Sequence, residues 1–147
     1  MGFREFLRET EAKTKKSAGL LPICKETGRI LVGFRDDGTW GVWGGGTKPD
    51  EKPKQTAIRE FEEETKYWGP LQMRFLYVSR RPNKTYTNYA AIIPKEFDPE
   101  LNSEHSGFRW CEYNELFELA DKHFGLEDLL LNCGPTIERI CNAHHQR

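Results

Sequence analysis

The sequence predicts an α/β fold in which a mixed β-sheet is covered by helices on both faces. Strand-like runs flank one charged amphipathic helix, and further helical patterns follow near the C-terminal end, an order typical of sheets packed between helices. The chain has 147 residues, of which 37% are hydrophobic, so it can bury the core of one ordinary domain. We see no linker, repeat or low-complexity run, and we expect a single domain over residues 1–147.

The first quarter of the chain predicts an amphipathic segment followed by a β-hairpin. Residues 1–16 place their large apolar side chains, Phe3, Phe6 and Leu7, on one side. Residues 17–24 and 29–35 predict the two strands of the hairpin, with a turn at 26–28 between them. An Asp-Asp-Gly turn at 36–38 then leads toward three consecutive glycines.

A helix is predicted from Asp50 and Pro53 onward. Asp is a good N-cap residue, and proline is tolerated in a first turn because its missing N–H would have no intrahelical partner there. Ala57, Ile58 and Phe61 share one face of this helix. These apolar residues would anchor the helix to a core.

The remainder of the chain predicts three more strands and two more helices. Residues 71–79 and 85–93 are expected to pair around a Pro-Asn turn, and residues 108–111 form a short later strand. Helical patterns occupy residues 114–120 and 135–143. The order of these elements completes the predicted sheet between helices.

Composition excludes some classes of function. The formal net charge of −1 and the pI near 6.4 indicate no basic surface large enough for general nucleic-acid binding. No apolar run approaches the ~20 residues of a membrane span, and residues 1–16 are too charged for a signal peptide. We therefore expect a cytoplasmic protein. Its four cysteines contain no CxxC pair, as expected for reduced and mostly buried thiols.

Glu60, Glu63 and Glu64 lie within five residues of one another on the predicted central helix. At these spacings the side chains share one helix face, with Cβ atoms about 5–6 Å apart. Like charges so close destabilise a helix, so the cluster indicates divalent-cation binding, with a solvated acidic face as the alternative. Arg59 lies four residues before Glu63, where it can pair with that carboxylate and orient it.

Residues 45–67 resemble the Nudix box, a pattern written G-x5-E-x7-R-E-U-x-E-E-x-G-U, in which U is a bulky apolar residue. The residues that match its fixed positions are Gly45, Glu51, Arg59, Glu60, Phe61, Glu63, Glu64 and Tyr67. So many matches at fixed offsets make the signal specific. On this resemblance the chain is identified as a member of the Nudix hydrolase family, which implies an α/β/α sandwich.

Two positions depart from the family pattern. Lys66 stands where the family has a second glycine, which would end the helix in a left-handed conformation that costs a Cβ-bearing residue energy. Because Gly69 and Pro70 follow, we expect the helix to run about one turn longer, with Lys66 near its negative end. Trp43 stands where many relatives have proline, a change that removes no ligand.

The resemblance implies a metal-dependent hydrolase. Glu60, Glu63 and Glu64 match the family's metal-binding glutamates, and the main-chain carbonyl of the residue matching Gly44 often joins them. Oxygen ligands of this kind suit Mg²⁺ or Mn²⁺, which can neutralise phosphate oxygens and activate an attacking water. We expect Glu60, Glu63 and Arg59 to belong to the catalytic set.

The general base is open at this point, because relatives use different glutamates, some in the box and some on a later loop. Glu104, which precedes the strand at 108–111, is the candidate loop carboxylate. Glu100 and Glu112 compete with it, and a plain surface carboxylate is the alternative for all three. Glu51 is expected either around the metal site or at the positive end of the helix.

Substrate recognition is expected from cationic and aromatic side chains that could hold phosphates or stack on a base. The candidates are Arg35, Trp40, Arg80, Arg81 and Tyr86, with Lys84 and Tyr89 as further members of the set. Core or strand packing is the alternative for the aromatic residues. Pro82 lies about 15 residues after the box, where ADP-ribose-cleaving relatives often carry a proline, although a hairpin corner would also explain it.

These features lead us to expect hydrolysis of a phosphoanhydride bond in a nucleoside diphosphate linked to another moiety, with ADP-ribose the leading candidate. The alternatives are a nucleoside triphosphate pyrophosphohydrolase acting on damaged nucleotides, a dinucleoside polyphosphate hydrolase, and a non-catalytic nucleotide sensor. The expected partner is a small nucleotide. A homodimer stays open, since dimers are common in the family.

Overall fold

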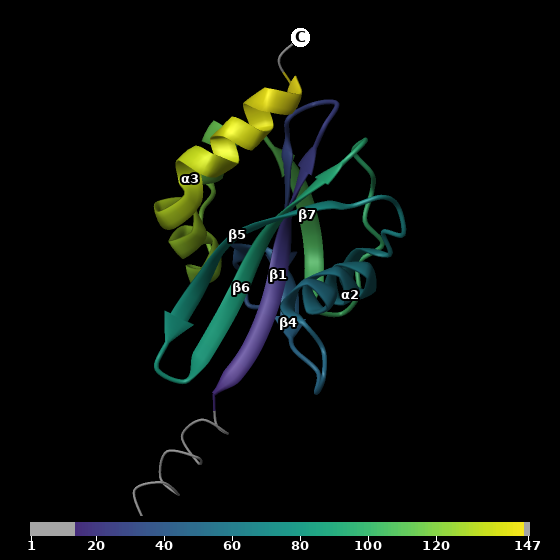
Figure 1. The fold of residues 1–147 in the computed structure, drawn as a ribbon. Helices are drawn as coiled ribbons and strands as arrows, with labels where there is room; N and C mark the ends of the chain where they lie inside the picture. The colour runs from purple at the N-terminus through teal and green to yellow at the C-terminus, as the bar shows by residue number, and fades with distance from the viewer. Residues whose placement is uncertain (1–13, 146–147) are drawn as a thin grey trace, which may run out of the picture.

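The computed structural model describes residues 14–145, which form one mixed β-sheet with helices on both sides (Figure 1). The strands are β1 (Lys15–Cys24), β2 (Ile30–Arg35), β3 (Trp40–Gly41), β4 (Trp43–Gly46), β5 (Gln72–Arg81), β6 (Lys84–Ile93) and β7 (His105–Cys111). The helices are α2 (Pro53–Thr65), the short 3₁₀ helix η1 (Tyr113–Glu118) and α3 (Phe124–His145). The predicted α/β class and mixed sheet are confirmed.

The β1 strand is the centre of the sheet. The strand order is β3-β2-β1-β6-β5, with β4 also paired to β1 and β7 to β2. β1 and β6 run parallel, from Lys15 opposite Lys84 to Cys24 opposite Ile93, whereas the other pairs are antiparallel. Since β1 has partners on both edges, its main chain is fixed along its whole length.

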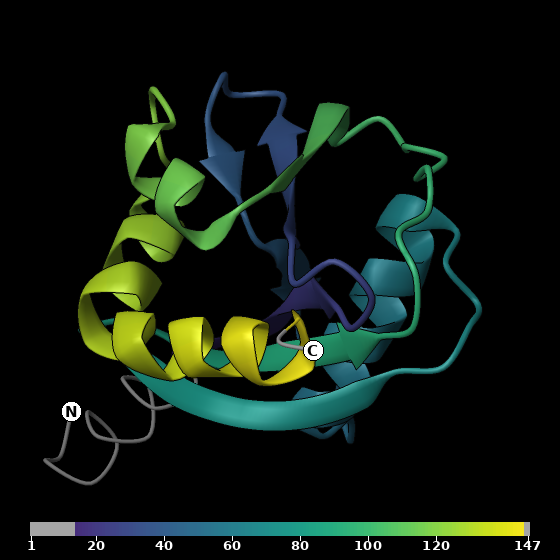
Figure 2. The ribbon, with the colours of Figure 1, turned by 90° about the horizontal axis from the view of Figure 1, so that it is seen from above.

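Two hydrophobic cores lie on the two faces of this sheet. Successive side chains of a strand point to opposite faces, so Leu20 packs in the core under α2 while Leu21 and Ile23 pack in the core under α3. Figures 1 and 2 show α2 and α3 on opposite sides of the sheet. The sequence prediction of a sheet covered on both faces is therefore confirmed.

The α2 helix is attached to the sheet through two fully buried residues that the sequence singled out, Ala57 and Phe61. The Phe61 ring meets the Trp43 ring edge-on at a centroid distance of 6.1 Å. Trp43 is itself fixed, because its indole N–H donates to the main-chain oxygen of Leu31 at 3.1 Å. Ile58, on the same predicted face, is only half-buried.

Both ends of α2 differ from the sequence prediction. Asp50 is not the N-cap but has a φ of 65° in the loop before the helix. The N-cap is Lys52, whose main-chain N–H donates to the Gln55 side-chain oxygen at 2.9 Å, and Pro53 begins the helix as predicted. Gln55 thus satisfies the main-chain N–H of the N-cap residue, and Asp50 lies outside the helix.

The expected extra turn at the C-terminal end of α2 is wrong. Lys66 adopts the left-handed conformation itself, with φ 60° and ψ 28°, and its N–H donates to the main-chain oxygen of Glu62 at 2.9 Å. Ending the helix here lets the Tyr67 ring pack between Phe61 and Phe97, at centroid distances of 5.6 and 4.7 Å. This packing outweighs the cost of a lysine in a conformation that favours glycine.

The last helix begins earlier than the sequence prediction of 135–143. The α3 helix already starts at Phe124 and carries Pro135 in its interior, on the exposed side. Leu126, Leu129 and Cys133 are buried under this first half and follow helical spacing. The predicted helix at 114–120 is instead the 3₁₀ helix η1, and the amphipathic N-terminal segment lies mainly outside the described residues.

Two predictions drawn from composition can be compared with the fold. All four cysteines are buried and free, as expected. Among residues 14–145, no helix has the length and apolar character needed to cross a bilayer.

Candidate active site

The glutamate face of α2 lies against the glycine-rich β4 strand. β4 pairs with β1, with Gly44 opposite Gly19 and Gly45 opposite Ala18, and α2 packs on the same two strands. A Cβ atom on Gly45 would lie 2.5 Å from the carboxyl carbon of Glu60. Only glycine therefore lets the Glu60 carboxylate lie so close to the strand.

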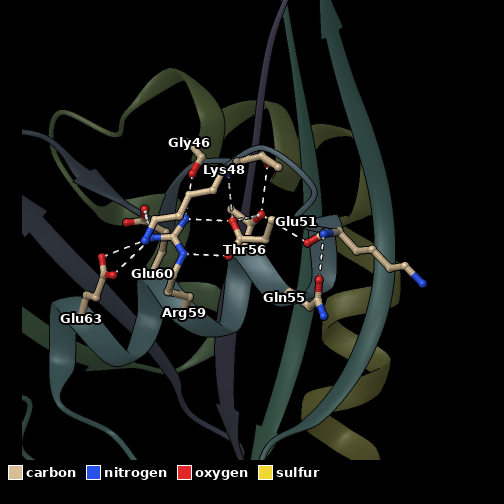
Figure 3. A network of polar contacts seen from close by, with 10 residues as sticks. Gly46, Lys48, Glu51, Gln55, Thr56, Arg59, Glu60 and Glu63 are labelled. Atoms are coloured by element: carbon tan, nitrogen blue, oxygen red, sulfur yellow. Dashed lines mark hydrogen bonds and ion pairs between the residues drawn. The ribbon is translucent and has the colours of Figure 1, made fainter.

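Arg59 is the centre of a network that joins the loop before α2 to the helix (Figure 3). Its guanidinium donates to both oxygens of Glu51, at 2.8 and 3.0 Å, and to the main-chain oxygen of Gly46 at 2.9 Å. It also donates to Glu60 at 2.9 Å and, more weakly, to Glu63 at 3.3 Å. The predicted Arg59–Glu63 pair is present, and Glu51 and Glu60 are held more tightly than Glu63.

Glu51 is an ionised anchor in this network. The hydrogen bond from Arg59 is the largest of the effects that lower its pKa to about 2, followed by one from the Lys48 main-chain N–H. The Thr56 hydroxyl donates to the same carboxylate at 2.8 Å. A carboxylate that accepts this many hydrogen bonds is strongly favoured in its charged form.

Glu64 lies deepest among the α2 glutamates, with only 2% of its surface exposed. The Gly44 main-chain N–H donates to its carboxylate at 2.9 Å. Burial raises the pKa of Glu64 to about 9, and a hydrogen bond with Glu104 and the negative charges of Glu60 and Glu104 add to the effect. Burial likewise raises the pKa of Glu60.

Burial raises both pKa values because the charged carboxylates need more positive charge nearby than Arg59 gives to Glu60. A divalent cation beside Glu60 and Glu64 would supply it, and hard oxygen ligands of this kind suit Mg²⁺ or Mn²⁺. The chemistry of the donor set therefore fits the predicted metal. Gly44 lies beside these carboxylates, and it contacts Glu64 through its main-chain N–H.

The loop before β7 carries Glu104 to the α2 glutamates. The Glu104 main-chain N–H donates to the Asn102 side chain at 3.0 Å, and its carbonyl accepts from Asp36 at 3.1 Å. Ligand atoms of Glu64, Glu104 and His105 lie within 4.8 Å of one another. Sequence reasoning missed His105, although it directly follows the candidate loop carboxylate.

The competing carboxylates occupy other places. Glu100 is exposed, and its main-chain N–H donates to the Thr65 carbonyl at 3.0 Å. Glu112 is the N-cap of η1, with its N–H bonded to the Glu115 side chain. Of the three, Glu104 is the one whose carboxylate lies beside Glu64, in the cluster that also contains the His105 ring.

A cavity of about 230 Å³ adjoins the same β4 glycines. Its remaining walls come from the β5–β6 hairpin, from the end of β2 and from the start of α3. The lining residues are Ser17, Arg35, Val42, Gly44, Gly45, Gly46, Ser79, Arg81, Lys84, Tyr86, Asn88, His123, Phe124 and Gly125. Three cationic side chains, from Arg35, Arg81 and Lys84, make this an anion-attracting pocket.

The structure brings together only part of the predicted substrate-binding set. Arg35, Arg81 and Tyr86 line the cavity, and the Arg81 guanidinium lies 3.5 Å from the centre of the Phe124 ring. Arg80 lines a separate hollow on the other side of β5. Trp40 packs against the ring of a neighbouring phenylalanine and the hydrophobic core.

Several cavity residues carried no signal in the sequence. Phe124 begins α3 and His123 directly precedes it, and the main-chain N–H of Gly125 donates to the His123 ring at 3.1 Å. Because the sequence pattern placed the helix further along, this turn was not a candidate. Ser79 and Asn88 enter the cavity through the pairing of β5 with β6.

Comparison with known proteins identifies the family. The family model of the NUDIX domain matches residues 13–133. The chain belongs to the NUDIX domain family. The Nudix box in α2 and the loop before it is therefore a true family motif, and Lys66 is a variation within it.

Curated relatives of this Nudix chain carry names of nucleotide hydrolases. The chain is 34% identical over 118 residues to "Putative 8-oxo-dGTP diphosphatase 3" of Mycobacterium tuberculosis, covering 70% of this chain and 54% of that protein. It is 26% identical to the asymmetrical bis(5'-nucleosyl)-tetraphosphatase of Caenorhabditis elegans, covering 72% of this chain and 85% of the relative. The chain thus spans about half the length of the M. tuberculosis relative.

Solved structures share the fold. A C. elegans Ap4A hydrolase binary complex superposes with a TM-score of 0.66 at 22% identity, covering 84% of this chain and 98% of that one. The NUDIX domain of Shewanella oneidensis NrtR, complexed with ADP ribose, gives a TM-score of 0.71 at 17% identity and covers 93% of this chain and 99% of that one. At these identities the likeness concerns the fold alone.

Proposed function

We propose that this Nudix chain hydrolyses a phosphoanhydride bond of a nucleotide with the help of Mg²⁺ or Mn²⁺. The observation that carries the proposal is that the acidic groups and the cationic cavity both adjoin the glycines of β4. The Glu60 and Glu64 carboxylates contact one side of the β4 glycines, and the cavity beside the same glycines carries Arg35, Arg81 and Lys84. Metal ligands and phosphate-binding cations would thus reach one substrate.

The α2 glutamates share one role in this proposal, and Arg59 has another. Glu60, Glu63 and Glu64 would hold the metal, which when bound supplies charge neutralisation to phosphate oxygens and makes water a better nucleophile. Arg59 positions Glu60 and Glu63 through its hydrogen bonds. The Gly44 carbonyl stays a proposed further ligand.

Glu104 is the proposed general base. It is exposed, so water can reach it, and its carboxylate lies in the same cluster as Glu64. A base must come within hydrogen-bond reach of the water that it deprotonates. Glu104 meets this requirement better than Glu100 or Glu112, which occupy other places in the fold.

The substrate is proposed from the cavity and from the relatives. ADP-ribose is the leading candidate from the sequence, but Pro82 lies at the exposed corner of the β5–β6 hairpin, which accounts for the proline without a ligand. Relatives named for an oxidised nucleoside triphosphate and for a dinucleoside tetraphosphate favour a longer phosphate chain. Three cationic side chains around one cavity suit such a phosphate chain. We therefore propose nucleoside polyphosphates as candidate substrates together with ADP-ribose.

A substrate panel tests this proposal. It contains ADP-ribose, a dinucleoside tetraphosphate and oxidised nucleoside triphosphates, each with Mg²⁺ or Mn²⁺. Products identify the reaction, because ADP-ribose yields AMP and ribose phosphate, whereas a triphosphate yields a monophosphate and pyrophosphate. Lack of turnover with the whole panel would remove the hydrolase proposal and favour a nucleotide sensor, for which binding would survive metal removal.

The metal ligands are tested by single substitutions in α2. Glu60→Gln or Glu64→Gln should lower kcat by orders of magnitude, since each removes charge that holds the cation. Glu62→Gln is the matched control, because Glu62 stands at a variable position of the box on the same helix and should leave kcat close to that of the native chain. Circular dichroism of all three variants checks the fold, and a loss of activity explained by unfolding would count against the assignment.

The remaining expectations from the sequence stay predictions. They are the single domain over residues 1–147, the cytoplasmic location and the homodimer.

A further inference from the structure

The His105 side chain lies at the start of β7 in a fixed pocket. Its residue is only 5% exposed, and its ring stacks on the Trp43 ring at a centroid distance of 4.6 Å and an angle of 33°. On another side lies Gly33, where a Cβ atom would be 2.7 Å from the imidazole. The fold therefore leaves room for this ring and holds its orientation.

Neither ring nitrogen of His105 has a hydrogen-bond partner among the described residues. A neutral imidazole carries one N–H donor and one acceptor nitrogen. Buried polar side-chain atoms in folded proteins are nearly always paired, and an unpaired one calls for an explanation such as an ion. Packing against Trp43 explains why the face of the His105 ring is buried, but it gives neither ring nitrogen a hydrogen-bond partner.

The surroundings of His105 indicate what the missing partner is. Ligand atoms of His105, Glu64 and Glu104 lie within 4.8 Å of one another. Ligand atoms that share one metal ion through bonds of about 2.0–2.2 Å are at most about 4.0–4.4 Å apart. Small side-chain rotations would bring His105 and Glu64 to one ion, with Glu104 beside it.

We propose that His105 is a nitrogen ligand of a divalent metal shared with Glu64, beside the Glu104 carboxylate, and that this ligand makes the site prefer Mn²⁺ to Mg²⁺. The inference rests on the proposed metal-dependent function, and it adds a ligand that the Nudix box does not contain. Imidazole is a ligand of transition metals, whereas Mg²⁺ takes oxygen ligands almost exclusively. A mixed set of carboxylates and one imidazole thus favours Mn²⁺.

The local backbone supports a positioned ligand. Glu104 and His105 follow Asn102, whose side chain accepts from the Glu104 N–H and whose carbonyl accepts from the His105 N–H at 3.4 Å. A register shift in the β2–β7 pair falls between Phe34 and Arg35, at the residue opposite His105. The turn and the bulge together set adjacent residues, Glu104 and His105, beside the same carboxylate of α2.

Pulsed electron paramagnetic resonance of the Mn²⁺-loaded full chain tests the proposal without any substitution. The protein is prepared once with natural histidine and once with ¹⁵N-labelled histidine. Coordination by imidazole predicts nitrogen modulation of the Mn²⁺ signal that changes with the isotope. An identical signal from both samples, or no bound Mn²⁺, would overturn the inference.

Variants then assign the nitrogen to one residue. His105→Phe keeps a ring against Trp43, and it should abolish the nitrogen modulation and weaken Mn²⁺ binding by roughly tenfold or more, with a smaller effect on Mg²⁺. His123→Phe is the matched control, since His123 lies outside the cluster, and it should keep the modulation. Modulation that survives in His105→Phe would contradict the proposal.

Failure of this inference is distinguishable from failure of the proposed function. Turnover of a nucleotide without imidazole modulation would leave the hydrolase standing and remove His105 from the metal. Nitrogen modulation without turnover of any substrate would keep His105 as a metal ligand and remove the hydrolase proposal.

Discussion

At the scale of single residues, the Arg59–Glu51 pair is the fixed point around which the acidic side of α2 is arranged. A guanidinium stays protonated at every working pH, so its donors are always available. Arg59 uses them on the Glu51 carboxylate, on the Gly46 carbonyl and on two of the proposed metal ligands. The pair therefore couples the glycine strand to the helix, and its role is to position the groups that would touch the metal.

Glu51→Gln should destabilise the fold in a pH-dependent way. Arg59 and its neighbours lower the folded-state pKa of Glu51 from 4.5 to about 2, so its charged form stabilises the fold above the unfolded-state pKa. That contribution disappears as the pH falls from about 4.5 to about 2. Urea unfolding at pH 7, 4 and 2.5 should show a large difference between variant and native chain at pH 7 and a small one at pH 2.5. A difference that does not change with pH would contradict this account.

At the scale of elements, the sequence predicted the type of each element more accurately than its first and last residues. The spacing of Ala57 and Phe61 correctly predicted the buried side of α2, and Pro53 its first turn. The last residue of α2 depends on the packing of Tyr67 against Phe97, which is distant in sequence. The local Gly and Pro residues therefore predicted a helix end too far along the chain. The sequence also failed to predict the early start of α3, because the first half of that helix is stabilised by burial against the sheet.

Lys66→Gly should stabilise the chain. Lys66 has a φ of 60°, where glycine avoids the steric cost of a Cβ, and the entropy that glycine loses on folding offsets part of this gain. We expect a net stabilisation of about 0.5–1 kcal/mol by urea unfolding. The control is Lys66→Ala, which removes the same long side chain but keeps the Cβ and should give no stabilisation. Equal effects of the two substitutions would show that the backbone conformation is not the cause.

At the scale of the whole molecule, the acidic side of the candidate site could be predicted from the sequence and the cavity could not. Glu60, Glu63, Glu64 and Arg59 lie on one helix, so their spacing alone places them on one face. The cavity joins residues from β2, from the β5–β6 hairpin and from the start of α3, which meet only in the folded chain. Composition indicated cationic candidates, but it could not tell which face of β5 each of two adjacent arginines would occupy.

Those two arginines give a test of the cavity with an internal control. Arg81 lines the cavity and stacks on Phe124, whereas Arg80, the preceding residue of β5, lines a hollow on the other side. Arg81→Gln should therefore raise KM for the nucleotide roughly tenfold or more, the loss expected for a charged hydrogen bond to phosphate, with a smaller effect on kcat. Arg80→Gln removes the same charge one residue away and should leave KM close to that of the native chain. Steady-state kinetics at constant ionic strength separates a specific contact from a general electrostatic effect. If both substitutions raised KM equally, overall charge and not the cavity would attract the substrate.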